Sequence, residues 1–338
     1  MRREKNAALL GHNTFGIDVR CAEFIEYETT DELQELIRRG GLRNTLHIGA
    51  GSNLLFCADY DGCVVHSKIG GIEILGSKGD EVEIRVGAGV TFDHLIAHCI
   101  GQGLYGLENL SLIPGEVGAS AVQNIGAYGA EAKDFIRRVE GIWLGSGEKF
   151  AMTNSECGYA YRRSIFKEEL RSKAAITHVT FALNRNFVPR LEYGGIRQAL
   201  VQNGYDEETL TAEQLRETII GIRRQKLPDP DVQGNAGSFF MNPIVSDETF
   251  RRIEKENPDV PHYRGDDGVK IPAAWLIEQS GWKGRTLGRA AVHARQPLVL
   301  VNAGGATGDD ILRLCEAVCK SVEERFGIRL KPEVNIIR

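Results

Sequence analysis

The first third of the chain changes from a strand-like to a helix-like hydrophobic pattern. Residues 24–27 alternate between apolar and polar side chains, which predicts a strand. A helix follows, with Thr30 as its candidate N-cap and Gly40-Gly41 as its end. The apolar face of this helix is formed by Leu33, Leu36 and Ile37.

A glycine-rich turn follows the next predicted strand, at residues 46–48, and runs into another apolar stretch at residues 54–56. The turn consists of Gly49, Ala50, Gly51, Ser52 and Asn53. It is not a Rossmann fingerprint, because that motif requires a third glycine and a following helix. Successive backbone amides in such a turn can hold a pyrophosphate. A tight turn without a ligand remains the alternative.

The middle of the chain predicts further strands on either side of a loop segment. A strand at residues 81–86 precedes a helix at 91–100, and strands dominate from 139 to 183. Residues 104–129 are rich in glycine, alanine and asparagine around Pro114 and carry little charge. This composition predicts closely packed loop and short helix around a buried ligand, although a packed loop without a ligand has the same composition.

The C-terminal third predicts a separate structural region. A helix at residues 213–224 ends at Leu227-Pro-Asp-Pro-Asp231, where two prolines in three residues indicate a domain boundary. A long amphipathic helix at 309–326 and a final strand at 333–337 follow. The pattern as a whole predicts an α+β protein with a distinct third domain.

Charge and cysteine content narrow the functional classes. The formal net charge of -5 supplies no field that attracts a polyanion, so we expect no nucleic-acid partner. Seven scattered cysteines do not form a disulfide framework and suit a reducing compartment. No stretch has the length of a membrane span, and the N-terminus lacks a signal-peptide core. We therefore expect a cytoplasmic protein that does not bind a membrane.

Ser238 is the candidate proton donor in the segment Asn235-Ala-Gly-Ser-Phe-Phe240, which follows Lys226 in the sequence. A hydroxyl beside apolar rings and cations can donate a proton in a dry site, although most serines are structural. The spacing of His94 and His98 would suit a metal, but the glutamate of the zincin motif is missing. We expect no metal site.

Read together, these segments resemble the family of UDP-N-acetylenolpyruvoylglucosamine reductases. Chance does not supply so many motifs in one order along nearly the whole chain. The segments that carry the resemblance are Asn13-Thr-Phe-Gly16, Gly49-Ala-Gly-Ser-Asn-Leu-Leu-Phe56, Gly106-Leu-Glu-Asn-Leu110, Ile113-Pro-Gly115, Gln123-Asn-Ile-Gly-Ala-Tyr-Gly129, Tyr161-Arg162, Ser164-Ile-Phe-Lys167, Lys226-Leu-Pro-Asp-Pro230, Asn235-Ala-Gly-Ser-Phe-Phe240 and Pro332-Glu-Val334.

The resemblance implies a three-domain α+β flavoprotein. Residues 1–70 and 71–221 would form two FAD-binding modules of the vanillyl-alcohol-oxidase type, and residues 331–338 would return to the first module. Residues 222–330 would bind the substrate. The implied reaction, in peptidoglycan biosynthesis, reduces UDP-N-acetylglucosamine enolpyruvate to UDP-N-acetylmuramate with NADPH as co-substrate. We expect a monomer with non-covalent FAD.

The resemblance also implies roles for particular residues. Ser238 matches the proton donor, and Arg162 and Glu333 match the pair that polarises the substrate carboxylate. Lys226, Asn242 and Gln296 match positions that bind phosphates, carboxylate and the nicotinamide cofactor. Tyr193, in the loop of residues 191–195 that marks the longer subtype, would cover the nucleotide. The residues implied to contact FAD are Gly49, Ala50, Gly51, Ser52, Asn53, Pro114, Gly115, Gln123, Asn124, Gly126, Ala127 and Tyr128.

Two departures and two alternatives accompany the resemblance. Asn335 stands where many relatives carry arginine, so a charge-assisted contact there is lost or moved. Arg163 follows Arg162, and on a strand it would point to the opposite face. One alternative is another FAD oxidoreductase of the same fold that acts on an alcohol or a lactone. The other is a nucleotide-sugar-binding module without flavin.

Overall fold

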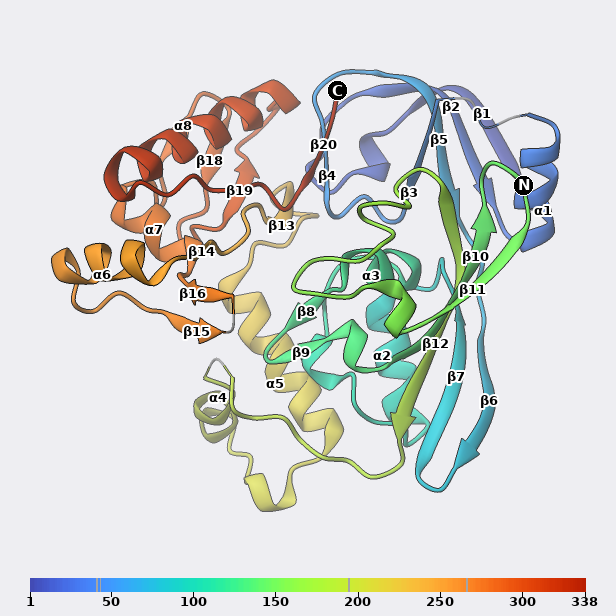
Figure 1. Ribbon diagram of the computed structural model, residues 1–338, viewed down its shortest axis with the longest axis horizontal. Helices are drawn as coiled ribbons and strands as arrows, with labels where there is room; N and C mark the ends of the chain where they lie inside the picture. The colour runs from blue at the N-terminus through green and yellow to red at the C-terminus, as the bar shows by residue number, and fades with distance from the viewer. Residues whose placement is uncertain (41, 43, 194, 266) are drawn as a thin grey trace. The chain divides into compact units, whose positions relative to one another are not determined.

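The computed structural model describes residues 1–40, 42, 44–193, 195–265 and 267–338, and its chain divides into two compact units (Figure 1). The first unit contains Met1–Ala7, Cys21–Ala50 and Asp61–Arg224, and the second contains Ala8–Arg20, Gly51–Tyr60 and Gln225–Arg338. This division is coarser than the three domains expected from the sequence, which stay a prediction.

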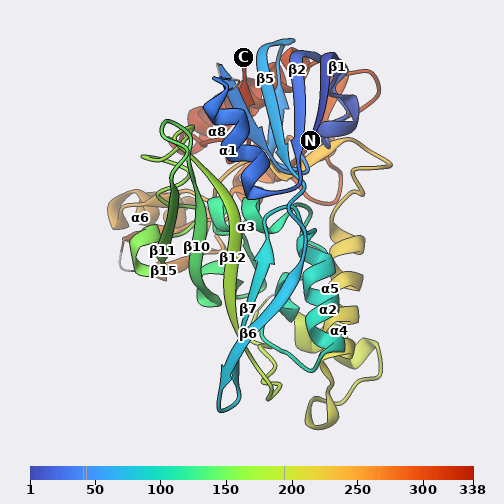
Figure 2. The same cartoon turned by 90° about the vertical axis from the view of Figure 1, so that its right-hand side faces the viewer.

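A four-stranded sheet of the first unit carries helix α1 (Thr30–Arg38) on one face (Figure 2). Leu33 and Leu36 of this helix are buried against Ile25 and Val65 of the sheet, as their helical spacing predicts. The strands, in spatial order, are β1 (Arg2–Ala8), β2 (Arg20–Tyr27), β5 (Tyr60–Ser67) and β3 (Thr45–Ile48). The expected strand, helix, strand unit is present, with β5 inserted between its two strands.

The cap of α1 differs from the sequence expectation by one residue. Thr29 is the N-cap, because its backbone is still extended and its side chain accepts a hydrogen bond from the amide of Glu32 at 3.1 Å. Thr30 is already helical. Gly40 follows the helix with a φ of 67°, as a helix end requires, and Gly41 lies outside the described residues.

A second sheet of the first unit is antiparallel throughout, and Figure 2 shows its strands side by side. Helices α2 (Phe92–Gly101) and α3 (Val117–Gln123) contribute Phe92 and Val117 to its buried core. The strands, in spatial order, are β11 (Lys149–Thr153), β10 (Ile136–Trp143), β12 (Ala174–Asn184), β7 (Glu81–Gly87) and β6 (Ile72–Lys78). The strands and the helix predicted for this region are confirmed.

Smaller elements complete the first unit. Helices α4 (Ile196–Gln202) and α5 (Ala212–Lys226) pack together, and α5 confirms the helix predicted at residues 213–224. A short ribbon joins β8 (Gly126–Ala127) and β9 (Ala130–Glu131). Single 3-10 turns of the first unit lie at Glu108–Leu110, Ala132–Asp134, Ser155–Cys157 and Glu207–Thr209, and a further one, at Leu10–His12, belongs to the second unit.

The second unit packs helix α8 (Gly308–Phe326) against strands β18 and β19 (Figure 1). Thr307 and Asp310 form a capping box that begins this helix one residue before its predicted start. The remaining helices are α6 (Asp247–Glu256) and α7 (Ala273–Gln279). One sheet contains β13 (Asn235–Ser238), β19 (Val299–Asn302), β18 (Ala290–Val292) and β17 (Thr286–Leu287), and another contains β14 (Ile244–Val245), β16 (Gly268–Lys270) and β15 (Tyr263–Gly265).

The C-terminal strand β20 (Asn335–Ile337) pairs in parallel with β4 (Leu54–Phe56), which directly follows the glycine-rich turn. The strand begins two residues later than the sequence pattern predicts, because residues 331–333 pair instead with residues 239–241. Among the described residues, no helix is both long and apolar enough to span a membrane.

Candidate functional site

The turn at residues 49–53 is closed to side chains at both of its glycines. A Cβ built on Gly51, whose φ is 71°, would overlap the carbonyl oxygen of His12. A Cβ on Gly49 would lie 3.1 Å from Oε2 of Glu116. Glycine is therefore required at Gly51 both by its backbone conformation and by the space around it. At both glycines the backbone of the turn therefore lies close to neighbouring residues, with no side chain of its own in between.

Asn53 ends this turn and is bonded to the C-terminal segment within the second unit. Both the backbone amide and the side-chain amide of Asn335 donate to the carbonyl oxygen of Asn53, at 3.0 and 3.2 Å. The side chain of Asn53 in turn donates to the carbonyl oxygen of Glu333 at 3.4 Å. Asn335 thus supports the turn with neutral hydrogen bonds.

The segment at residues 113–129 contains the short helix α3, which begins after Pro114 and Gly115; the composition of residues 104–129 predicted a short helix there but not its start. The amides of Val117 and Gly118 donate to the carbonyl oxygens of Val90 and Ala88, each at 2.9 Å. These two amides at the start of α3 are therefore satisfied by the protein itself. The close approach also explains Gly118, where a Cβ would lie 2.9 Å from that of Ala88.

Gln123 and Asn124 have opposite environments, although both were expected to contact FAD. The side chain of Asn124 is fully buried and donates to Glu131 and to the carbonyl of Ala160, each at 2.9 Å. Its oxygen accepts from the amide of Lys133 at 3.0 Å, so this side chain is occupied within the protein. The Oε1 atom of Gln123 is buried and has no hydrogen-bond partner within the described ranges.

Arg162 lies in a tight turn, with a φ of 55°, and its Nη2 donates to the carbonyl oxygen of Gly126 at 2.8 Å. Ala160 and Arg163 close this turn by hydrogen bonds at 3.2 and 3.0 Å. The expectation that Arg163 lies on a strand was therefore wrong. The Nε of Arg163 instead forms an exposed ion pair with Glu168 at 2.8 Å.

Tyr128, Tyr193 and Arg223 lie near one another in the first unit, at the end of the segment of residues 113–129. The rings of Tyr128 and Tyr193 pack edge to face, with centroids 6.3 Å apart. Tyr193 is 48% exposed, which leaves its ring accessible, and Gly194 of its loop lies outside the described residues. The Nε of Arg223 donates to the carbonyl oxygen of Leu112 at 3.3 Å. Burial lowers the pKa of Arg223, although the nearby Tyr128 and Asp93 favour its charged form.

Ser238 and Glu333 are brought together within the second unit. The amide of Glu333 donates to the carbonyl oxygen of Phe239 at 2.8 Å, and Phe240 pairs with Pro332. Ser238 ends β13 and is exposed, whereas the rings of Phe239 and Phe240 are buried. The two rings are thus core side chains, whereas Ser238 is exposed rather than enclosed between them.

The remaining predicted substrate residues also lie in the second unit. Lys226 is exposed at the end of α5. The side-chain oxygen of Asn242 accepts from the amide of Ala273 at 2.9 Å, near the start of α7. The side-chain oxygen of Gln296 accepts from the amide of Leu298 at 3.4 Å. Asn242 thus bonds to the segment before α7, Gln296 bonds within its own loop, and the long exposed amine of Lys226 extends from a helix end.

Sequence reasoning missed two histidines beside the glycine-rich turn. His66 lies between Glu26 and Glu116, at distances of 3.2 and 2.9 Å from its two ring nitrogens. Burial lowers the pKa of His47 to about 4, and its Nε2 has no hydrogen-bond partner in the part of the chain that the structure describes. A single histidine carries no pattern in the sequence, so only long-range packing reveals these two.

The residues present fit a flavin. The orphaned Oε1 of Gln123 is an acceptor suited to a ring N–H group, and the glycine-rich turn lets backbone amides approach a pyrophosphate. Among the described residues, no group of three or more histidine, cysteine or acidic side chains is placed to hold a metal ion. All seven cysteines carry free thiols.

Comparisons with known proteins agree with this picture. Residues 22–150 match the model of an FAD binding domain, and residues 229–337 match that of the UDP-N-acetylenolpyruvoylglucosamine reductase C-terminal domain. The chain is 53% identical to the UDP-N-acetylenolpyruvoylglucosamine reductase of Bacteroides fragilis strain YCH46, over 99% of this chain and 100% of that protein. It is 44% identical to the same enzyme of Porphyromonas gingivalis strain ATCC 33277, over 96% of each chain.

A solved structure shares the fold. The crystal structure of UDP-N-acetylenolpyruvylglucosamine reductase from Thermus caldophilus has a TM-score of 0.69 and covers 100% of this chain and 98% of its own, at 23% identity. The α+β fold and the FAD-binding domain expected from the sequence are therefore confirmed.

Proposed function

The chain belongs to the UDP-N-acetylenolpyruvoylglucosamine reductase family, and from this premise we propose that it reduces UDP-N-acetylglucosamine enolpyruvate to UDP-N-acetylmuramate. The proposed cofactor is non-covalent FAD, the co-substrate is NADPH, and the product enters peptidoglycan biosynthesis. The observation that carries the proposal is the pairing of residues 331–333 with residues 239–241, which places Glu333 beside the segment of Ser238.

FAD held by the turn at residues 49–53 and the segment at residues 114–128 would supply hydride-transfer chemistry between NADPH and the terminal carbon of the enolpyruvyl double bond. Negative charge then builds on the adjacent carbon and spreads into the carboxylate of the substrate. A transition state of this kind is stabilised by fixed cations and by a positioned acid. The protein must therefore hold the carboxylate, supply one proton and exclude water from the reacting carbon.

Ser238 supplies this proton in the proposed mechanism. Its hydroxyl lies at the exposed end of β13, and the buried rings of Phe239 and Phe240 anchor the chain directly after it. Glu333 and Arg162 act on the substrate carboxylate and so favour charge on the adjacent carbon. Arg162 belongs to the first unit and Ser238 and Glu333 to the second, so their joint action on one substrate is part of the proposal.

Substrate recognition is assigned to four further residues. Tyr193 presents an accessible ring that can cover the nucleotide base, a stacking role that suits a large planar side chain. Lys226 has the long flexible amine that suits a phosphate. Asn242 and Gln296 complete the set through their side-chain amides, whose oxygens accept from the backbone amides of Ala273 and Leu298.

FAD is held, in this proposal, by the turn at residues 49–53 and by the segment at residues 114–128. The close backbone approach at Gly49 and Gly51 and the unpartnered oxygen of Gln123 support this assignment. The side chain of Asn124 is occupied by the protein, so Asn124 acts through its backbone or through the shape of the segment. We also propose that the protein is a cytoplasmic monomer.

Mixing the protein with NADPH and UDP-N-acetylglucosamine enolpyruvate tests the function, with NADPH absorbance as the readout. We expect oxidation of NADPH that depends on the sugar, and formation of UDP-N-acetylmuramate. Flavin-bearing protein that oxidises an alcohol or a lactone, and leaves the enolpyruvyl sugar unchanged, would support the alternative oxidoreductase. Protein purified without flavin absorbance, and unable to bind added FAD, would support a nucleotide-sugar-binding module.

A further inference from the structure

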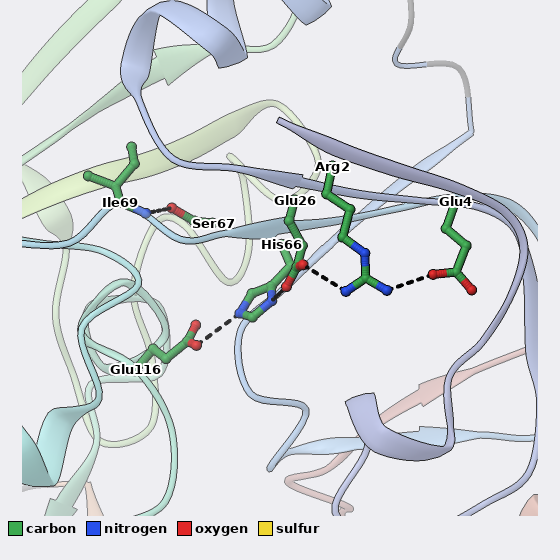
Figure 3. A network of polar contacts seen from close by, with 7 residues as sticks. All are labelled: Arg2, Glu4, Glu26, His66, Ser67, Ile69 and Glu116. Carbon is green, nitrogen blue, oxygen red and sulfur yellow. Dashed lines mark hydrogen bonds and ion pairs between the residues drawn. The ribbon is translucent and has the colours of Figure 1, made fainter.

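The imidazole of His66 lies between two carboxylates from different elements of the first unit (Figure 3). Its Nε2 lies 2.9 Å from Oε1 of Glu116, the N-cap residue of α3, and its Nδ1 lies 3.2 Å from Oε1 of Glu26 on β2. His66 itself lies on β5. His66 and Glu116 are only 5% and 7% exposed. One ring thus ties the four-stranded sheet of the first unit to the start of α3.

Hydrogen-bonding capacity explains why this geometry is specific. A carboxylate only accepts hydrogen bonds, so both contacts of His66 act as hydrogen bonds only when each ring nitrogen carries a hydrogen. A buried polar group that loses its partner is costly, which ties the three side chains to one arrangement. Arg2 extends this series of polar contacts to the surface, with its Nη1 3.4 Å from Oε2 of Glu26. The exposure of Arg2 makes this contact weak.

The second oxygen of Glu116 faces the glycine-rich turn. A Cβ built on Gly49 would lie 3.1 Å from Oε2 of Glu116 and 3.3 Å from the Cβ of Ala119. Glu116 makes no side-chain cap bond to α3, although it occupies the N-cap position. Its carboxylate therefore spans from His66 to Gly49 instead of serving its own helix. The backbone beside it is fixed separately, by the bond of Phe92 N to the carbonyl of Gly115 at 3.0 Å.

We propose that Glu116, held by His66 and Glu26, is a positioning residue for FAD. This inference rests on the proposed function, because it concerns how the flavin is held. The Glu116 carboxylate sets the separation between the glycine-rich turn, at Gly49, and the start of the segment at residues 114–128. These are the two segments assigned to the cofactor. His66 fixes the carboxylate in the rotamer that faces Gly49, and Glu26 fixes the ring. None of the three is required to touch the cofactor or the reacting carbon.

The first test measures the FAD dissociation constant of apoprotein by quenching of flavin fluorescence. Glu116→Ala is expected to weaken FAD binding by about 10- to 100-fold, the range for loss of a hydrogen bond to a charged group. Glu116→Gln keeps the shape and one acceptor, and should restore affinity to within about threefold of the wild type. Glu140→Ala, which removes a half-buried ion pair with Arg85 elsewhere in the first unit, is the matched control and should bind FAD normally.

A double-mutant cycle tests the contact with Gly49 directly. Gly49→Ala places a methyl group against the Glu116 carboxylate, so it should weaken FAD binding by about tenfold in the wild-type background. In the Glu116→Ala background the same change should cost no more than about threefold, since the oxygen is gone; the difference lies within the range of coupling between touching residues. Equal losses in both backgrounds would show that Glu116 does not define the space at Gly49.

A second readout separates positioning from loss of folding. Visible circular dichroism of the bound flavin should change in Glu116→Ala and in His66→Gln, while urea unfolding of the apoproteins shows the fold retained. Variants that bind FAD with wild-type affinity and an unchanged flavin spectrum would overturn this inference alone. If the apoprotein of Glu116→Ala is unfolded, His66→Gln decides the matter, because it leaves the Glu116 carboxylate in place and removes the ring that holds it. Wild-type protein that binds no FAD would overturn the proposed function as well.

Discussion

The backbone amide of Glu333 donates to the carbonyl oxygen of Phe239 at 2.8 Å, directly after Ser238. The neighbouring residues Phe240 and Pro332 form a bridge in the same antiparallel sense. The proposed proton donor and the proposed acidic partner are therefore held by paired backbone rather than by flexible loops. This arrangement favours catalysis because it fixes both groups before the substrate arrives.

Replacing Ser238 by alanine should separate the two half-reactions. Reduction of the flavin by NADPH should stay within about twofold of the wild type, whereas reoxidation by the enolpyruvyl sugar should slow by at least about 10² to 10⁴, the range for a positioned acid. Stopped-flow absorbance of the flavin measures both steps. Equal slowing of both half-reactions would rule out Ser238 as the proton donor. Glu333→Gln should show the same pattern, and loss of FAD from that variant would make Glu333 a structural residue.

Gly51→Ala should destabilise the protein far more than strain alone requires. The substitution combines an unfavourable positive φ with overlap between the new methyl group and the carbonyl oxygen of His12. Gly79 is a matched control, because its φ of 61° is similar but a Cβ there meets nothing within 4 Å. We expect Gly79→Ala to lower the free energy of unfolding by about 1 kcal/mol and Gly51→Ala by about 3 kcal/mol or more.

Urea unfolding with and without FAD measures this difference. The added FAD should stabilise Gly79→Ala as it does the wild type, and should stabilise Gly51→Ala much less. Equal stabilisation of both variants would separate the Gly51 turn from the cofactor.

The pH dependence of stability should reveal the ion pair of Asp93 with Arg216, whose two contacts measure 2.6 and 2.8 Å. Burial by itself raises the pKa of Asp93. Hydrogen bonds from Arg216 and from the amide of Leu112 lower the pKa by more than burial raises it, so the net pKa lies below the ordinary 3.8. The stabilisation is therefore present above pH 4 and is lost as the pH falls through the lowered pKa.

Asp93→Asn should lower the free energy of unfolding at pH 7 by about 2 kcal/mol, between the values for exposed and buried pairs, and should weaken the loss of stability below pH 4. Glu81→Gln removes the exposed pair with Arg137 and serves as the control, with an expected change of at most about 0.5 kcal/mol. If Asp93→Asn loses stability below pH 4 as steeply as the wild type, that loss comes from other carboxylates.

Tyr193→Ala should raise the KM for the sugar nucleotide by about two- to tenfold, because stacking on an aromatic ring contributes about 0.5–1.5 kcal/mol. FAD affinity and the rate of flavin reduction by NADPH should not change. Tyr193→Phe keeps the ring and should stay close to the wild type. Tyr263, a similarly exposed tyrosine of the second unit, provides a control substitution. A KM that is unaffected in Tyr193→Ala would remove this loop from the substrate site.

Local pattern predicted helices α1, α2, α5 and α8 and several strands of the first unit, and its errors at the ends of these elements were small and had local causes. The cap of α1 moved from Thr30 to Thr29, because both threonines can accept the capping bond and only the backbone distinguishes them. The prediction that Arg163 lies on a strand was wrong, because a four-residue turn between longer strands carries no periodic signal. Periodicity reports on faces of regular elements and says little about turns of this length.

Long-range relations were harder to predict. The approach of Glu333 to the Ser238 segment followed from the family resemblance, since nothing local in either segment indicates it. The pairing of His66 with Glu116 was not predicted, because the residues are 50 positions apart and each is an ordinary polar residue in the sequence. The fully occupied side chain of Asn124 was likewise hidden, since a motif shows which residue is present but not which way it faces.

The parallel pairing of β20 with β4 has a consequence for synthesis of the chain. Asn335 bonds to Asn53, 282 positions earlier, so this part of the second unit cannot pair until residues 335–337 have left the ribosome. The segments of the first unit, by contrast, have all been made once residue 224 has emerged. A messenger truncated near its 3′ end would therefore yield a chain whose first unit can fold while the glycine-rich turn lacks its C-terminal support, exposing that nascent product to proteolysis.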